Sequence, residues 1–338
     1  MELSEAVEKQ FVMVIDPNSF DYGDPTTFVS SYYNENLELA VVAKNEHGRV
    51  SFRSFSAPKD SRFPEYFSNF IQIASEFDIP CHAFMHSFGD AFLGADPNYS
   101  VEKSGGNPIS QFVCPSNTSF WKYGSTIAKE ISRFPISSLI IDEHYFPRLD
   151  YCFCRRCRIE FRNMTGMEFD IALEDILGDE DLLFRYVDWR SETVANSLSE
   201  IVQTFKQEKP DTPVFVVIPI DPELDWITGA AMHLGLDLDF IAEIIDGVVF
   251  SVQPFSPMYP MTGTQPWLQL AERIKSVSRK FPHLKVSLML NGLEQEWDIS
   301  WFIDLFQEIR GFRMFGKMAE GQLYNLKREV IRGTDTTW

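Results

Sequence analysis

Three of the five cysteines in the chain fall within six residues of one another. Cys152, Cys154 and Cys157 form a Cys-x-Cys-x2-Cys run, a spacing that brings three thiolates onto one turn, as a tetrahedral soft-metal site requires. Cys114 opens a Cys-Pro-Ser-Asn loop and is the expected fourth ligand, because Cys81 lies inside an apolar run, where a buried free thiol is the ordinary interpretation. Four thiolates leave no position open for water, so the predicted cofactor is a structural zinc ion.

Two other interpretations of the three clustered cysteines stay open. They are reduced thiols in a basic turn beside Arg155 and Arg156, or a redox centre, although no flavin or nicotinamide fingerprint accompanies them. An odd number of cysteines without a secretion signal argues against a disulfide framework.

The second group able to do chemistry is the run Asp142-Glu143-His144-Tyr145. Two carboxylates that face each other across a cleft can hydrolyse a glycosidic bond, because one protonates the leaving oxygen while the other attacks the sugar or activates water. Whether a second carboxylate faces this run depends on the elements that carry it.

Short apolar runs rich in β-branched residues recur along the chain and predict eight buried, parallel strands. These runs cover residues 11–16, 38–43, 79–85, 137–142, 213–219, 247–253, 284–290 and 311–318. Stretches with helical periodicity lie between them, at 63–77, 120–134, 182–206, 267–281 and 301–309.

Alternating strands and helices in this number predict an α/β fold, a (β/α)8 TIM barrel. An open doubly wound sheet is the main rival, but no Gly-rich phosphate turn follows the first strand. We expect one barrel domain over residues 1–332, a frayed tail at 333–338, and an extended insertion between strands four and five that carries the cysteine cluster.

In such a barrel, chemistry takes place where the strands end at their C-terminal side. Polar residues follow several of the predicted strands there, and carboxylates after strands four and seven would face each other across the ring. The expected substrate-binding residues are Asp16, His86, Tyr145, Gln253, Tyr259, Asn291 and Trp297.

The stretch around the cysteines resembles glycoside hydrolase family 42, the zinc-containing β-galactosidases. The resemblance lies in the run Ile-Ile-Asp-Glu-His-Tyr that contains Glu143, in the following Cys-x-Cys-x2-Cys, and in the upstream Cys-Pro-Ser-Asn. It implies that Cys114 completes the zinc site, that Glu143 is the acid/base, and that Glu294 or the nearby Glu296 is the nucleophile of a retaining mechanism. Asp142 stands where the family has an asparagine. The same run also resembles uncharacterised barrels classed as hypothetical glycoside hydrolases.

The expected function is therefore that of a glycoside hydrolase, with Asp142 raising the pKa of Glu143 as a neighbouring like charge. In an alternative glycosidase, Asp142 is the nucleophile, with the acid supplied by Asp221, Glu223 or Glu294. Since successive strand residues point to opposite faces, we expect only one of Asp142 and Glu143 to enter the cleft. A non-catalytic carbohydrate-binding barrel with a structural zinc site is the rival from another class.

Charge narrows the range of partners. The 338 residues contain 49 Asp and Glu against 30 Lys and Arg, a net charge of −19, which disfavours nucleic acid and anionic membranes as partners. The N-terminus lacks the features of a signal peptide, and no apolar run approaches the ~18 residues of a spanning helix. We expect a cytoplasmic protein with a carbohydrate substrate, and the sequence also allows a homo-oligomer.

Overall fold

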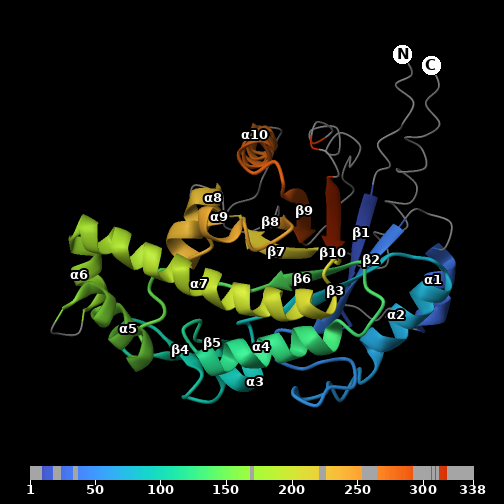
Figure 1. Cartoon of the computed structure of the whole chain (residues 1–338), viewed down its shortest axis with the longest axis horizontal. Helices are drawn as coiled ribbons and strands as arrows, with labels where there is room; N and C mark the ends of the chain where they lie inside the picture. Colours follow the sequence, from blue (N-terminus) through green and yellow to red (C-terminus); the bar gives the residue numbers. More distant parts are fainter. Residues whose placement is uncertain are drawn as a thin grey trace.

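Eight parallel strands close into a barrel in the computed structural model of the chain (Figure 1). The structure describes residues 10–17, 24–32, 37–167, 171–220, 226–252, 265–291, 306, 309 and 312–317. The barrel strands are β1 (Gln10–Ile15), β2 (Leu37–Lys44), β3 (Cys81–His86), β6 (Ser138–Asp142), β7 (Val214–Pro219), β8 (Gly247–Val252), β9 (Lys285–Asn291) and β10 (Arg313–Lys317).

The strand order around the ring is β1-β10-β9-β8-β7-β6-β3-β2. This closed order confirms the (β/α)8 barrel and excludes the open doubly wound sheet. Alternate residues point into and out of the barrel: Phe84 of β3 and Ile140 of β6 pack inside it, whereas Leu139 and Ile141 pack outside it against the helices. His86 is paired in register with Asp142 at the C-terminal ends of β3 and β6. We call this end of the barrel the mouth.

Helices cover the outside of the barrel wherever the described chain connects two strands. The larger ones are α1 (Pro25–Tyr32), α2 (Tyr66–Glu76), α4 (Thr118–Ile131), α7 (Glu180–Glu208) and α10 (Gln265–Lys280). The connection between β7 and β8 consists of shorter turns: α8 (Trp226–Gly229), the π-helix η2 (Ala230–Leu234) and α9 (Leu238–Ile241). The helix predicted over 301–309 falls mostly outside the described residues, and the tail predicted at 333–338 falls entirely outside them.

The helix α7 is the longest element and packs along α4 (Figure 1). Asp179 caps its first turn, because its side chain accepts a hydrogen bond from the Leu182 N–H at 3.0 Å. Together with α5 (Arg155–Thr165) and α6 (Leu173–Gly178), it forms the insertion between β6 and β7 that the sequence predicts. The cysteine trio lies at the start of this insertion, where Cys154 precedes the first turn of α5.

A short antiparallel hairpin lies between β3 and α4 and has no counterpart in the sequence prediction. Its strands are β4 (Ser100–Glu102) and β5 (Pro108–Val113), and α3 (Ala91–Gly94) precedes it. The hairpin was not predicted, because β4 has only three residues and β5 mixes polar with apolar residues and buries only its last one, so the chain there lacks the continuous apolar runs that identify the barrel strands. It carries the chain from the end of β3 to Cys114.

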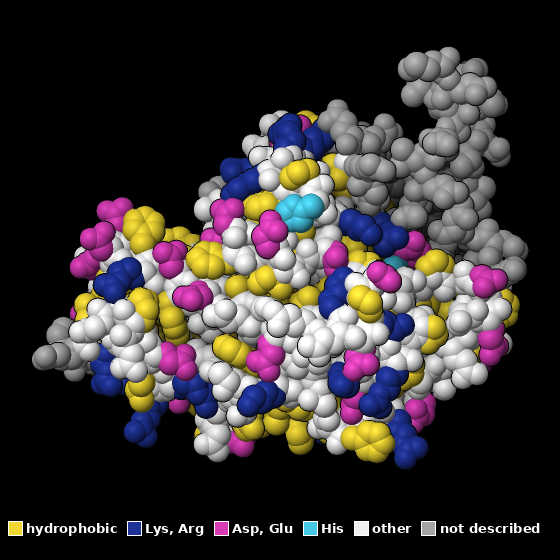
Figure 2. Space-filling model, in the orientation of Figure 1, with side chains coloured by type: hydrophobic (Ala, Val, Ile, Leu, Met, Phe, Trp, Pro, Cys, Tyr) yellow, Lys and Arg dark blue, Asp and Glu magenta, His cyan; other side chains and the backbone are white. Residues whose placement is uncertain are grey.

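Acidic and basic side chains are interspersed on the face of the molecule in Figure 2. Hydrophobic side chains reach the surface at the end formed by α5, α6 and α7, where Met164, Leu177 and Phe184 are exposed. Among the residues that the structure describes, no helix has the length and apolar character needed to cross a membrane.

Candidate active site and four-cysteine cluster

Glu143 follows the last residue of β6 in an uncommon backbone conformation. Its φ angle is +52°, in the left-handed region that residues other than glycine seldom adopt. The backbone there is held on both sides, because the Glu143 N–H donates to Oδ1 of Asp142 at 2.7 Å and the Phe88 N–H donates to the Glu143 carbonyl at 2.9 Å. Strained residues of this kind cluster at functional sites, so the outlier marks Glu143 as a candidate.

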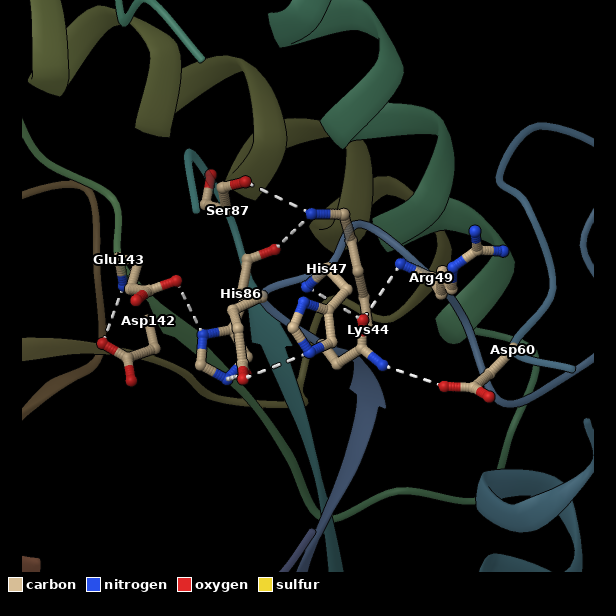
Figure 3. A network of polar contacts seen from close by, with 10 residues as sticks. Lys44, His47, Arg49, Asp60, His86, Ser87, Asp142 and Glu143 are labelled. Atoms are coloured by element: carbon tan, nitrogen blue, oxygen red, sulfur yellow. Dashed lines mark hydrogen bonds and ion pairs between the residues drawn. The ribbon is translucent and has the colours of Figure 1, made fainter. Parts of the chain in front are cut away.

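The turn at Glu143 changes where the two carboxylates of this run lie. Strand alternation places Asp142 on the same face as Ile140, inside the barrel. The left-handed residue then interrupts the alternation, and the Glu143 side chain also turns towards the mouth, where it meets His86 (Figure 3). The expectation that only one of these side chains enters the mouth is therefore wrong, because the strand geometry on which it depends ends at Asp142.

His86 at the end of β3 is the nearest partner of Glu143. Its Nδ1 lies 2.9 Å from Oε2 of Glu143, and its Nε2 lies 3.8 Å from Oε2 of Glu46, in the loop after β2. Burial lowers the pKa of His86, but the hydrogen bond to Glu143 and the charges of Glu143, Asp142 and Glu46 outweigh it, so the pKa is raised. The pair therefore favours an imidazolium beside a carboxylate.

Gly89 makes room for the Glu143 carboxylate. A Cβ atom added at Gly89 would overlap Oε2 and the carboxyl carbon of Glu143. The backbone of Gly89 bridges to Phe112 of β5, so the hairpin fixes this position. The absence of a side chain at residue 89 is thus a condition for the observed position of Glu143.

Lys44 forms hydrogen bonds with the backbone at the end of β3, where His86 lies and the loop to Gly89 begins. Its ammonium donates to the carbonyls of His86 at 2.8 Å and Ser87 at 3.3 Å (Figure 3). It also lies 3.0 Å from Oδ2 of Asp90. A bulge in β2 between Val42 and Lys44 interrupts the alternation. Lys44 and Asp90 are 2% and 0% exposed, so they form a buried ion pair.

The two residues after Glu143 differ in their surroundings. His144 is fully buried, and its ring nitrogens lie 2.8 Å from the hydroxyls of Ser87 and Ser197. Burial lowers its pKa to about 4, so the ring is neutral and links β6 to α7. Tyr145 is half-buried against the core; burial, then the charges of Asp142 and Glu143, raise its pKa well above the usual value.

The remaining predicted substrate-binding residues are only partly covered by the structure. Asp16 lies just beyond β1 at the mouth and is 2% exposed. Asn291 ends β9, but its side chain falls outside the described residues. Several predicted site residues lie wholly outside them: Asp221, Glu223, Gln253, Tyr259, Glu294, Glu296 and Trp297. The carboxylate after strand seven stays a prediction.

The four predicted cysteine ligands come together in one buried cluster. The Sγ atoms of Cys114, Cys152, Cys154 and Cys157 all lie within 4.8 Å of one another, and Cys114 Sγ lies 3.3 Å from that of Cys157 and 3.6 Å from that of Cys154. No cysteine is in a disulfide. Cys81, at the start of β3, is buried apart from the cluster.

The donor set fits a tetrahedral thiolate site. Ligands about 2.3 Å from a central zinc ion stand ~3.8 Å apart, close to the observed spacing. The backbone N–H groups of Glu102 and Cys154 point at Cys152 Sγ from 3.4 and 3.5 Å. Hydrogen bonds from Cys114 and then Cys152 hold the pKa of Cys154 far below its usual range, whereas a hydrogen bond with Cys152 raises the pKa of Cys114 and burial raises that of Cys157. The cluster can hold a metal ion and joins the end of β5 to the start of α5.

The sequence did not indicate two residues of the site, Glu46 and Gly89. Glu46 contacts His86 from the loop after β2, and Gly89 contacts Glu143 from the loop after β3. Glu46 lies two residues after β2, so a survey of the strand ends that continued past Lys44 would have included it. The signal for Gly89 is the Gly-Asp pair shortly after β3, although its contact with Glu143 depends on the fold.

No family model matches the chain, and no curated protein matches it in sequence. Solved structures do resemble its fold. The PgaB (BpsB) glycoside hydrolase domain from Bordetella bronchiseptica has a TM-score of 0.73 at 10% identity, over 96% of this chain and 98% of that one. The β-amylase catalytic domain from Paenibacillus polymyxa has a TM-score of 0.67 at 11% identity, over the same shares.

A β-galactosidase from the psychrophilic Marinomonas ef1 has a TM-score of 0.68 at 8% identity, over 96% of this chain and 60% of that one. At such identities the likeness shows the fold alone. The chain thus has the barrel found in several glycoside hydrolases, with carboxylates at its mouth and a buried four-cysteine cluster beside it.

Proposed function

We propose that the protein is a glycoside hydrolase with Glu143 as its general acid/base. The observation that carries the proposal is the placement of this carboxylate: it lies at the C-terminal end of β6, in a left-handed conformation, hydrogen-bonded to His86 and fitted over Gly89. The mouth is where enzymes with this barrel carry out their chemistry. The likeness to glycosidase barrels supports the same reaction class.

In the proposed reaction, Glu143 protonates the leaving oxygen and later removes a proton from water. Glu294, or Glu296, is the proposed nucleophile of a retaining mechanism, which requires the two carboxyl groups to be ~5–5.5 Å apart. The negative charge of Asp142 opposes the loss of the proton from Glu143, whereas a cationic His86 beside Glu143 acts in the opposite direction. The alternative assignment makes Asp142 the nucleophile. The position of Asp142 on the inner face of the barrel, at the end of β6, is compatible with that assignment.

We further propose that the cysteine cluster binds one structural zinc ion, as the resemblance to the zinc-containing β-galactosidases implies. Four thiolates would complete a tetrahedral shell and leave no position for water or substrate. Cys114 follows β5, and the other three ligands precede or begin α5. These ligands would cross-link the hairpin, which carries the bridge to Gly89, with the insertion that follows Glu143.

The test is a screen of aryl glycosides with the wild-type protein, Glu143→Gln and Asp142→Asn. Glu192→Gln is the matched control, since Glu192 is exposed on α7. We expect turnover of at least one glycoside, lost in Glu143→Gln and kept in the control. Loss in Asp142→Asn alone would favour the alternative assignment. Sugar binding without any turnover would favour a carbohydrate-binding barrel and contradict the proposed activity.

A further inference from the structure

The His86 imidazole lies between two carboxylates from different loops of the mouth. Glu143 approaches Nδ1 at 2.9 Å and Glu46 approaches Nε2 at 3.8 Å. The exposed fractions of these side chains are 22% for Glu143, 11% for His86 and 42% for Glu46. The row Glu46–His86–Glu143 therefore runs from a solvent-accessible carboxylate to a mostly buried one.

The surrounding structure fixes both the position of His86 and its electrostatic environment. Its carbonyl accepts a hydrogen bond from Lys44, and its ring packs 5.4 Å from that of Phe84. Asp142 and Glu143 face the imidazole from β6, and Glu46 faces it from the loop after β2. The nearby ammonium of Lys44 is paired with Asp90. Three carboxylates thus act on one imidazole.

We propose that His86, held from its far side by Glu46, positions the Glu143 carboxylate and holds the proton that this carboxylate exchanges. The inference rests on the proposed function, since an acid/base residue must be found in both protonation states. One proton lies either on Nδ1, with His86 cationic and Glu143 anionic, or on Oε2, with both groups neutral. The net charge of the pair is zero in either state, so transfer from Nδ1 to Oε2 needs no other reactant.

This arrangement gives His86 a positioning role and leaves the chemistry on the sugar to Glu143. Glu46 favours the cationic form of His86, because a carboxylate beside the second nitrogen stabilises a proton there. Removal of either carboxylate should then lower the pKa of His86. A histidine that only fills space would not respond in this way.

The first test is an NMR titration of the histidine rings in the wild-type protein, Glu143→Gln and Glu46→Gln. We expect the pKa of His86 to fall by about 1 unit or more in Glu143→Gln and by less in Glu46→Gln. Glu243→Gln is the control: Glu243 lies 3.9 Å from His283 in an exposed pair, and its loss should leave His86 unchanged. A His86 pKa that is the same in the wild type and in Glu143→Gln would overturn the inference.

The second test compares His86→Asn with His86→Gln. The asparagine amide can take the place of Nδ1 and still donate to Glu143, whereas the glutamine amide reaches the place of Nε2. We expect kcat to fall about tenfold more in His86→Gln, with KM little changed. His86→Asn should also lose the limb of the pH profile that follows the pKa measured for His86. Equal losses with an unaltered profile would contradict the positioning role.

The two tests separate this inference from the proposed function. Turnover by the wild type, with a His86 pKa that is the same in the wild type and in Glu143→Gln, would overturn the inference but would still support the proposed glycoside hydrolase activity. A wild type without turnover, in which the His86 pKa still depends on Glu143, would support the pairing and count against the glycosidase.

Discussion

At the scale of single residues, the position of the Glu143 carboxylate depends on the missing side chain of Gly89. We predict that Gly89→Ala displaces this carboxylate from His86, because the new methyl group would occupy its place. Turnover should fall at least about 10²-fold, as a misplaced catalytic group can cost that much. The melting temperature should change little, since the methyl group meets the end of a movable side chain.

Gly178→Ala is the matched control, because a Cβ there meets nothing within 4 Å. Turnover and thermal melting should be compared for both variants and the wild type. Full activity in Gly89→Ala would show that the observed position of Glu143 is not needed for turnover.

The residues of the candidate site differ in how far the sequence could identify them. The cysteines and Glu143 lie in short local motifs, so their types and spacing are visible in the chain. Glu46 and Gly89 act through contacts with residues that are distant in sequence, and no local spacing encodes those contacts. The backbone conformation of Glu143 could not be predicted either, because no local sequence pattern indicates a left-handed glutamate.

At the scale of elements, His144 links the end of β6 to α7 and should make stability depend on pH. Its pKa is about 4 in the folded protein and about 6.5 in the unfolded chain. Between these values the unfolded chain binds the extra proton, so stability falls as the pH falls through this window. From pH 7 to pH 5 the contribution of His144 to the free energy of unfolding should drop by about 2 kcal/mol.

The measurement is urea unfolding at both pH values for the wild type and for His144→Gln. The lowered pKa of the buried His82 acts in the same direction, and the raised pKa of His86 acts in the opposite one, losing its contribution as the pH rises. The contribution of His144 is therefore the change in unfolding free energy between the two pH values in the wild type minus the same change in His144→Gln. An identical loss of stability in both would rule out this origin for the pH dependence.

The barrel strands could be predicted because each is a short apolar run between polar segments. Predicted strand 137–142 and observed β6 differ by one residue, and the register of β3 with β6 then brings His86 beside Asp142. The hairpin β4–β5 could not be predicted in this way, because β4 has only three residues and β5 buries only its last residue.

At the scale of the whole molecule, the cysteine cluster should act as a cross-link between segments far apart in the chain. We predict one zinc ion per chain, measured by elemental analysis of protein purified without added metal or chelator. Cys114→Ala should lose the zinc and lower the melting temperature by on the order of 5–10 °C, because metal binding contributes directly to folding.

Cys81→Ala is the control for this prediction. It removes a buried thiol outside the cluster, at a cost of about 1 kcal/mol, and should keep the zinc. A wild-type protein that contains no metal, with all five cysteines open to thiol reagents once unfolded, would contradict the zinc site.

The central claim is that Glu143 protonates a departing sugar oxygen, and the dependence of the rate on the leaving group tests it most directly. A dinitrophenolate leaves without a proton, whereas an alkoxide needs one. We predict that Glu143→Gln carries out the first chemical step, measured as kcat/KM, at a rate near that of the wild type with a dinitrophenyl glycoside and about 10²–10⁴-fold more slowly with the matching alkyl glycoside. Complete turnover should be slow with both substrates, because Glu143 also accepts the proton of water in the second step. Equal losses in kcat/KM with both leaving groups would contradict the account.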